Sequence, residues 1–180
     1  MIGLGEKFPE FKKPACVSLK PGKEFADISS EDHKKAGKWM VMFWYPKDFT
    51  FICPTEIAEF NAQNGEFEKR NATLIAASTD TEYVHLGWRN AAPELKNLEI
   101  PMLADTSKSL GKKLGILEKE FKFAYRVTFI VDPEGIIQWI GAYGLDDGRN
   151  VKEVLRVMDS LQIGGLTPCN WEPGQETLKV

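Results

Sequence analysis

The chain has 180 residues, of which 43% are hydrophobic and 27% charged, and a formal net charge of −3 at pH 7. This length suits one globular domain that needs no disulfide or metal to hold its core, and the charge balance gives no basic surface for nucleic acid. The first residues lack the pattern of a signal peptide and no window is apolar enough for a membrane helix, so the sequence predicts a cytoplasmic protein without a membrane partner.

The first clear element is a continuous apolar run over residues 39–45, closed by Pro46. Such a run is typical of a strand that is buried on both faces of a sheet. From Pro54 onward, apolar residues recur at helical spacing with acidic residues between them, which predicts an amphipathic helix over residues 54–70. Pro54 would take the first helical position, where its missing N–H costs nothing.

The next elements indicate a mixed sheet. Residues 73–78 form a short apolar run, and a helical pattern that begins at Thr81 follows it, which predicts parallel pairing through a right-handed crossover. Residues 126–132 and 136–142 have the composition of strands, and the tight turn between them predicts an antiparallel hairpin.

The last helix is expected to begin at Asn150, with Glu153 as the partner in a variant of the capping box, and to end before two glycines at 164 and 165. Beyond it the sequence has no periodicity. The sequence therefore predicts an α/β domain over residues 1–163, with a mixed central sheet flanked by helices, and an extended tail over residues 164–180.

One cysteine, Cys53, directly precedes Pro54 and so falls at the expected N-terminus of a helix. A thiol attacks only as the thiolate, which helix N-termini and nearby cations favour. Residue types alone leave a second interpretation open, in which Cys53 is a small hydrophobic residue buried where a strand meets a helix.

The stretch "PKDFTFIC" has proline, threonine and cysteine in the pattern P-x-x-x-T-x-x-C, and here the sequence resembles the peroxiredoxins. Together with the downstream "TFIVDPEG" and "GRNVKEVLRV", it is similar to the typical two-cysteine branch and its bacterial members, from about Lys7 to the C-terminus. The resemblance implies a thioredoxin-like fold in which Cys53 is the peroxidatic cysteine. Its thiolate would attack a hydroperoxide and become a sulfenic acid.

The resemblance also implies roles for four residues around this thiol. Pro46 would shield it, and the Thr50 hydroxyl would donate to the thiolate or to an oxygen near it. Arg126 would face the thiolate and stabilise both it and bound peroxide, although from residue types alone a surface charge beside a strand is the commoner case. Glu56 would lie in the first turn of the Cys53 helix and orient Arg126.

A sulfenic acid must be trapped before it is oxidised further, and the resemblance assigns that role to Cys169 in "TPCNW". In the two-cysteine branch this resolving cysteine comes from the other chain of a dimer, which gives an intersubunit disulfide. From the sequence pattern alone, Cys169 is also compatible with an inert tail residue. Cys16 matches no functional position and is expected to be a small buried residue near the N-terminus.

No metal or organic cofactor is expected, because the cysteines and the two histidines show no ligand spacing and the redox change would reside on sulfur. The resemblance implies a peroxide substrate, either hydrogen peroxide or an organic hydroperoxide. It also implies a homodimer, with five dimers forming a ring, and a dithiol reductant that is a thioredoxin, a dedicated flavoprotein or another thiol carrier.

Two other functions remain as alternatives. A thiol-disulfide oxidoreductase normally needs a C-x-x-C pair, and Glu56 occupies the place of the second cysteine. A holdase chaperone activity of the assembled rings is the other alternative, as a secondary role.

Overall fold

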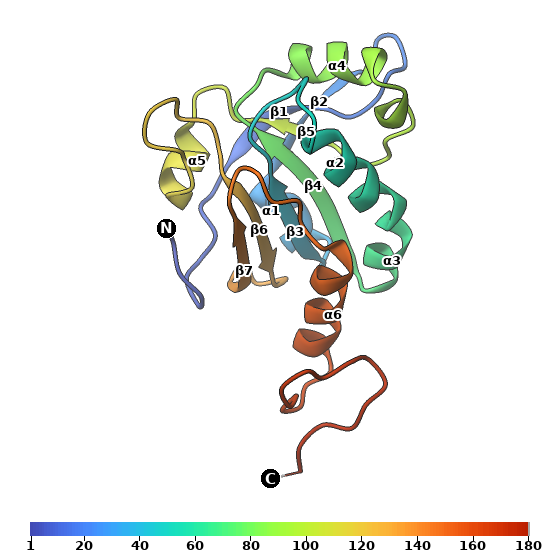
Figure 1. The fold of residues 1–180 in the computed structure, drawn as a ribbon, viewed down its shortest axis with the longest axis vertical. Helices are drawn as coiled ribbons and strands as arrows, with labels where there is room; N and C mark the ends of the chain where they lie inside the picture. Colours follow the sequence, from blue (N-terminus) through green and yellow to red (C-terminus); the bar gives the residue numbers. More distant parts are fainter. Residues whose placement is uncertain (180) are drawn as a thin grey trace.

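The computed structural model describes residues 1–179, which form one central sheet between two layers of helices (Figure 1). The seven strands are β1 (Lys12–Cys16), β2 (Phe25–Ser29), β3 (Trp39–Trp44), β4 (Ala72–Ser78), β5 (Met102–Ala104), β6 (Arg126–Val131) and β7 (Ile137–Tyr143). The helices are α1 (Ser30–Lys35), α2 (Cys53–Ala62), α3 (Asn64–Lys69), α4 (Glu82–Ala91), α5 (Ser109–Leu114) and α6 (Val151–Gln162), with a short 3₁₀ turn at Pro93–Leu95.

The strand order is β2-β1-β5-β4-β3-β6-β7. β3 pairs with β4, and β4 with β5, in parallel, while the other neighbouring pairs are antiparallel. The mixed sheet that the sequence predicts is therefore confirmed. No helix among residues 1–179 is long and apolar enough to cross a membrane.

The central strand β3 is buried on both faces, as its apolar run predicts. Val41 and Phe43 pack with α2, α3, α4 and α6, and the Phe43 ring stacks on Phe60 of α2 with the centroids 4.0 Å apart. Met40 and Met42 face the other way, toward α5 and the N-terminal segment. β3 therefore contributes side chains to the hydrophobic core on both faces of the sheet. Its burial also fixes the position from which the following loop begins.

The helix predicted over residues 54–70 is divided into two. It begins one residue earlier than expected, at Cys53, and it breaks at Gln63, which ends α2 and precedes α3. The residues after the break, Asn64 and Gly65, are both weak helix formers. Asn64 is also buried, and its amide donates to Glu68 one turn further along α3 and to Glu99, which lies outside both helices.

Five elements were not predicted from the sequence. The N-terminal hairpin of β1 and β2, the short helices α1 and α5, and the three-residue strand β5 carry no clear periodicity. Their positions depend on pairing with distant parts of the chain, such as the contact of β1 with β5.

The predicted hairpin of β6 and β7 is confirmed, with antiparallel pairing from Arg126–Tyr143 onward. Its turn closes with the N–H of Gly135 donating to the carbonyl of Asp132 at 2.9 Å. Gly135 has a φ of 85°, which only glycine adopts easily, and a Cβ there would contact the Lys34 side chain.

The last helix, α6, is capped by Asn150, whose side chain accepts from the N–H groups of Lys152 and Glu153. The expected reciprocal bond of the capping box is absent from this part of the structure, because the Glu153 carboxylate instead accepts from Arg156. The N-terminal cap is therefore confirmed and the capping-box variant is wrong.

The tail beyond α6 has no helix or strand, as expected, but it is not simply extended. It turns back on itself, with Leu166 and Leu178 forming a bridge, and it lies beyond the far end of α6 from the sheet (Figure 1). Trp171 is only 1% exposed, and its carbonyl accepts from Arg156 at 3.0 Å. The buried Trp171 therefore fixes the tail, and its backbone carbonyl connects the tail to α6.

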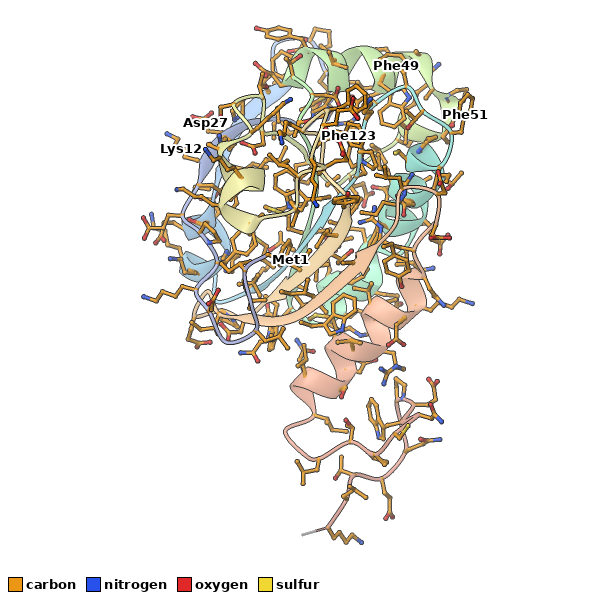
Figure 2. The ribbon with its side chains drawn as sticks, turned by 60° about the vertical axis from the view of Figure 1, so that its left-hand side comes forward. Met1, Lys12, Asp27, Phe49, Phe51 and Phe123 are labelled. Atoms are coloured by element: carbon orange, nitrogen blue, oxygen red, sulfur yellow. The ribbon has the colours of Figure 1, made fainter. Side chains whose placement is uncertain are left out.

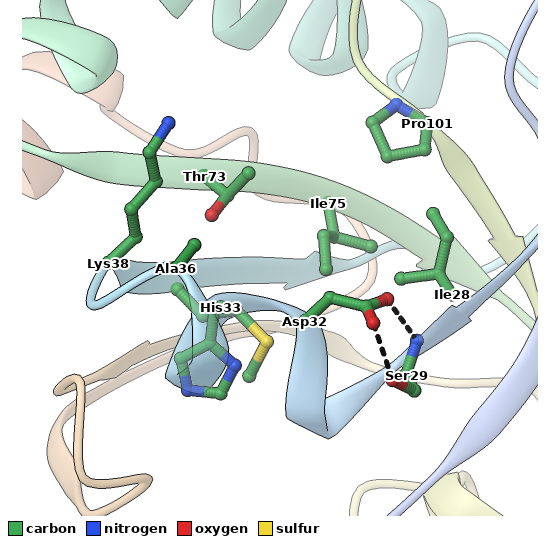
Figure 3. Close-up of a pocket in the computed structure, with 10 residues that line it drawn as sticks. Ile28, Ser29, Asp32, His33, Ala36, Lys38, Thr73, Ile75 and Pro101 are labelled. Carbon is green, nitrogen blue, oxygen red and sulfur yellow. Dashed lines mark hydrogen bonds between the residues drawn. The ribbon is translucent and has the colours of Figure 1, made fainter.

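A pocket of about 270 Å³ lies between α1 and the beginnings of β3 and β4 (Figure 3). Its walls are mainly apolar, and its polar residues include Asp32, which bonds to Ser29, and the buried His33. It contains no cysteine and shares no residue with the pocket that contains Cys53.

Candidate active site

Cys53 is the first residue of α2, and it is 1% exposed. In the first turn of the helix, the N–H groups of Thr55 and Glu56 donate to the carbonyl of Ile52, and Pro54 has no N–H. The N–H of Cys53 has no backbone acceptor within residues 1–179. The N-terminus of α2 therefore offers fewer free N–H groups to stabilise a thiolate than its position in the sequence suggests. Side chains must supply the remaining hydrogen-bond donors.

A buried cluster of Arg126, Glu56 and Arg149 lies beside the Cys53 sulfur. Arg126 Nη1 donates to Cys53 Sγ at 3.4 Å and to Glu56 Oε2 at 2.7 Å. Arg149 approaches the same carboxylate from another segment, with Nε to Oε1 and Nη2 to Oε2 both at 2.8 Å. The three side chains are between 1% and 5% exposed. Glu56 therefore holds both guanidinium groups, and Arg126 connects them to the thiol.

The charges in this cluster do not cancel among themselves. Two arginines against one carboxylate leave one positive charge in a buried region, where the interaction between charges is stronger than in water. A thiolate at Cys53 would neutralise that charge. The cluster therefore favours a negative group at the position of the sulfur.

Arg126 is also fixed from its other side. Its Nε and Nη2 donate to the carbonyl of Leu145 at 3.0 and 2.8 Å. Burial lowers the pKa of Arg126, but its bonds to Cys53 and Glu56 outweigh this effect and the net pKa is raised. The guanidinium is therefore both permanently charged and held in one orientation.

Cys53 and Arg126 line a pocket of about 270 Å³ that opens to solvent. The Thr50 hydroxyl donates to the carbonyl of Lys47 at 2.9 Å. Its hydrogen therefore bonds to this carbonyl rather than to the Cys53 sulfur or to an oxygen near it, the two acceptors expected from the sequence. The residues that line the pocket are Pro46, Lys47, Thr50, Phe51, Ile52, Cys53, Phe123, Arg126, Leu145 and Asp146.

The loop between β3 and α2 is tied down by a buried polar network. Asp48 accepts from Tyr45 Oη at 2.8 Å and pairs with His85 Nδ1 of α4 at 2.7 Å, and its N–H donates to Asp80. Burial raises the pKa of Asp48, while the bonds to His85 and Tyr45 act in the opposite direction. The contact of His85 with this loop joins residues 37 positions apart, so spacing along the sequence does not reveal it.

The other two cysteines lie apart from this pocket. Cys169 is exposed in the tail beyond α6 and is a free thiol. Cys16 is fully buried in β1, with its sulfur 3.7 Å from Arg89 Nη1. Burial raises the pKa of the Cys16 thiol, and Arg89 opposes that effect only in part. The interpretation of Cys16 as a small buried residue is confirmed.

The structure thus brings Cys53, Glu56 and Arg126 into direct contact and places Pro46 and Thr50 in the same pocket, while Cys169 is elsewhere. Sequence reasoning missed Arg149, which makes more contacts with Glu56 than Arg126 does. Its signals were its place directly before the helix cap Asn150 and its presence in the stretch "GRNVKEVLRV", which resembles the peroxiredoxins. Residues 1–179 contain no cluster of three or more His, Cys, Asp and Glu side chains that could bind a metal.

Comparison with known proteins gives consistent matches over the whole chain. A model of the AhpC/TSA family matches residues 4–140. The chain is 44% identical to alkyl hydroperoxide reductase C of Mycobacterium tuberculosis, in an alignment that covers 99% of this chain and 94% of that protein. It is 39% identical to a thioredoxin peroxidase of Echinococcus granulosus, with 98% of this chain and 92% of that protein covered.

Two solved structures are similar in both fold and sequence. The structure of AhpC from Mycobacterium tuberculosis superposes with a TM-score of 0.86 at 43% identity, covering 96% of this chain and 99% of that one. A reduced 2-Cys peroxiredoxin from Plasmodium vivax superposes with a TM-score of 0.89 at 31% identity, covering 98% and 92%.

Proposed function

The chain belongs to the AhpC/TSA family of thiol-dependent peroxidases and has their thioredoxin-like fold, and on that premise we propose that Cys53 is the peroxidatic cysteine. The substrates are hydrogen peroxide and organic hydroperoxides. The observation that carries this proposal is the 3.4 Å contact between Arg126 Nη1 and Cys53 Sγ, within a buried cluster that has one unbalanced positive charge.

The reaction needs only the sulfur and a positively charged surrounding. The thiolate attacks one oxygen of the hydroperoxide, so that an S–O bond forms while the O–O bond breaks. The departing oxygen takes a proton and leaves as water or an alcohol, and Cys53 becomes a sulfenic acid. The sulfur is oxidised and the peroxide is reduced by the same two electrons. Negative charge grows on the departing oxygen, and a fixed donor such as Arg126 lowers the barrier.

The surrounding residues have distinct supporting roles. Glu56 and Arg149 orient Arg126, because Glu56 bonds to both guanidinium groups. Pro46 shields the thiol without adding a competing N–H donor. Thr50 contributes a hydroxyl whose oxygen can still accept from the O–H of a bound peroxide while its hydrogen is bonded to Lys47.

Replacing Arg126 with methionine should lower kcat/KM for hydrogen peroxide by about 10²-fold, the usual loss when one preorganised donor is removed. Methionine keeps much of the side-chain volume but removes the charge and all donors. The matched control is Arg70→Met, since Arg70 also forms a bidentate ion pair, with Asp159, but lies elsewhere on the surface. Equal activity of the two variants in a peroxide-consumption assay would contradict the role of Arg126.

Cys169 is proposed as the resolving cysteine, acting on the Cys53 of a second copy. The start of α6 lies beside the site, because the N–H of Arg149 donates to Glu56 at 3.1 Å. The helix then runs away for 12 residues, or about 18 Å, before the tail begins (Figure 1). A disulfide needs Cα atoms within about 7 Å, so the tail of the same chain is badly placed and that of a partner chain is favoured. The thiol of Cys169 attacks the sulfenic acid, forming the disulfide and releasing water.

Replacing Cys169 with serine should abolish the covalent dimer that forms after peroxide treatment. The sulfenic acid on Cys53 would then have no partner thiol at that position and would persist or be oxidised further. Non-reducing electrophoresis and intact mass measure this, and Cys16→Ser is the control in which the covalent dimer should still form. A covalent dimer in the Cys169→Ser protein would rule out this assignment.

We also propose the partners that membership of this family implies, namely further copies of this chain and a reductant. A homodimer would provide the second chain, and a ring of five dimers the larger assembly. A thioredoxin-type dithiol would reopen the disulfide, and the Echinococcus relative carries the name thioredoxin peroxidase. A flavoprotein or another thiol carrier are the other candidates. Such a cycle needs a reducing compartment, and we place it in the cytoplasm.

A further inference from the structure

One wall of the Cys53 pocket contains Phe123, whose ring stacks on that of Phe121. Phe121 and Phe123 belong to the hairpin between α5 and β6, and their rings are nearly parallel, at 7°, with centroids 6.3 Å apart. Phe123 lines the pocket together with Cys53 and Arg126, whereas Phe121 is 63% exposed. An aromatic surface therefore stands at the point where a substrate must enter.

The Lys47 ammonium group holds this pair in place. Its Nζ lies 4.3 Å from the centroid of the Phe123 ring and 5.7 Å from that of Phe121, which are cation–π distances. Lys47 also lines the pocket, and its carbonyl accepts the Thr50 hydroxyl. One residue thus connects the aromatic wall to the loop that leads to Cys53.

The backbone of the hairpin is also well ordered by its own bonds. Leu117 and Ala124 form a bridge, and the N–H of Glu118 donates to the carbonyl of Phe123 at 2.8 Å. The Glu118 carboxylate accepts from the N–H groups of Glu120 and Phe121. The rings are therefore positioned before any substrate arrives, which reduces the entropy cost of binding to them.

The pocket is much larger than the smallest substrate requires. It measures about 270 Å³, whereas a water molecule occupies roughly 30 Å³ in the liquid and hydrogen peroxide has only one further heavy atom. A hydroperoxide whose O–O bond lies between Cys53 and Arg126 must direct its remaining atoms toward the mouth. The pocket has apolar side chains for those atoms to contact, namely Phe51, Ile52, Phe123 and Leu145. Phe51 stands at the outer edge of the molecule (Figure 2).

We propose that Phe123, held by Lys47 and Phe121, is the specificity-determining residue of this peroxidase and favours hydroperoxides that carry an aryl or bulky alkyl group. The organic group packs on the Phe123 ring, while the reacting oxygens meet Cys53 and Arg126. Phe123 thus contacts the substrate, and Lys47 is a positioning residue that acts through it. This inference rests on the proposed peroxidase function of Cys53.

The test compares cumene hydroperoxide with hydrogen peroxide as substrates of the full-length protein. In Phe123→Ala, the ratio of kcat/KM for cumene hydroperoxide to kcat/KM for hydrogen peroxide should fall about tenfold, which is typical when an apolar contact to a substrate is lost. A damaged fold or a displaced Cys53 would lower both values together and leave the ratio unchanged. An unchanged ratio would overturn the inference.

Two further comparisons separate the contact from other causes. Phe49→Ala removes an exposed phenylalanine of the loop between β3 and α2 that does not line the pocket, and the ratio should stay at the wild-type value. Lys47→Met should lower the ratio, and Lys47→Arg should restore it, because arginine keeps the cation over the rings. If the ratio falls equally in Phe49→Ala, or is the same in both Lys47 variants, the assignment is wrong. If the wild-type protein reduces neither peroxide, the proposed function fails instead.

Discussion

Replacing Cys53 with serine should abolish peroxide turnover, with a loss of at least about 10⁴-fold, the scale seen when a nucleophile is removed. A serine hydroxyl does not ionise near neutral pH and is a poor nucleophile toward oxygen. It also forms no product equivalent to the sulfenic acid. The fold should tolerate the change, since the side chains are similar in size and the position adjoins Arg126, which can donate to either atom.

A single-turnover assay without reductant gives the clearest measurement of this variant. Wild-type protein should consume one equivalent of hydrogen peroxide per chain, Cys169→Ser should consume the first equivalent as well, and Cys53→Ser should consume none. Peroxide consumption by Cys53→Ser would show that another group carries the chemistry. The same variant separates the holdase alternative, because protection of an unfolding client protein should survive the substitution if that activity exists.

Replacing Arg149 with methionine should lower the free energy of unfolding by about 3 kcal/mol, at the lower end of the range for breaking a buried ion pair. Arg149 is 1% exposed and bonds to both Glu56 oxygens, to the carbonyl of Trp44 and to Thr128. Its loss leaves a buried carboxylate that only Arg126 still pairs with, and an unpaired carbonyl at the end of β3. Peroxide turnover should fall too, because Glu56 would no longer be fixed from both sides.

Urea unfolding at a single protein concentration measures this change, since assembly would otherwise alter the apparent stability. The matched control is Arg70→Met, which removes a bidentate pair that is partly exposed and should cost no more than about 1 kcal/mol. A cost for Arg149→Met that equals the cost for Arg70→Met would mean that the buried cluster contributes nothing special to the fold.

Arg126 and Arg149 differ in how well the sequence predicts their place in the site. Arg126 was singled out because it stands at a position that a known family motif marks, as the first residue of a predicted strand. Arg149 stands in an irregular loop before a helix cap, where an arginine is normally a solvated charge. Its pairing with Glu56 joins residues 93 positions apart, and no local pattern reports such a contact.

A second limit appears where local preferences compete with the tertiary structure. The Thr50 hydroxyl was expected to donate to the thiolate or to an oxygen near it, and instead it donates to the Lys47 carbonyl, three residues earlier in the same loop. The predicted long helix is broken at Gln63, where the weak helix formers Asn64 and Gly65 follow and the Asn64 amide also reaches Glu99 outside the helix.

Features that depend on neighbours along the chain can be predicted from local patterns. Apolar periodicity, proline and glycine positions and capping residues account for the buried strand β3, the cysteine at the start of α2, the hairpin of β6 and β7 and the Asn150 cap. Local patterns do not specify which charges meet at the sulfur or which aromatic rings line the pocket, because these depend on the folded arrangement of distant segments. Those contacts join segments such as Cys53 and Arg126, 73 positions apart, whose distance is set by how the sheet orders its strands.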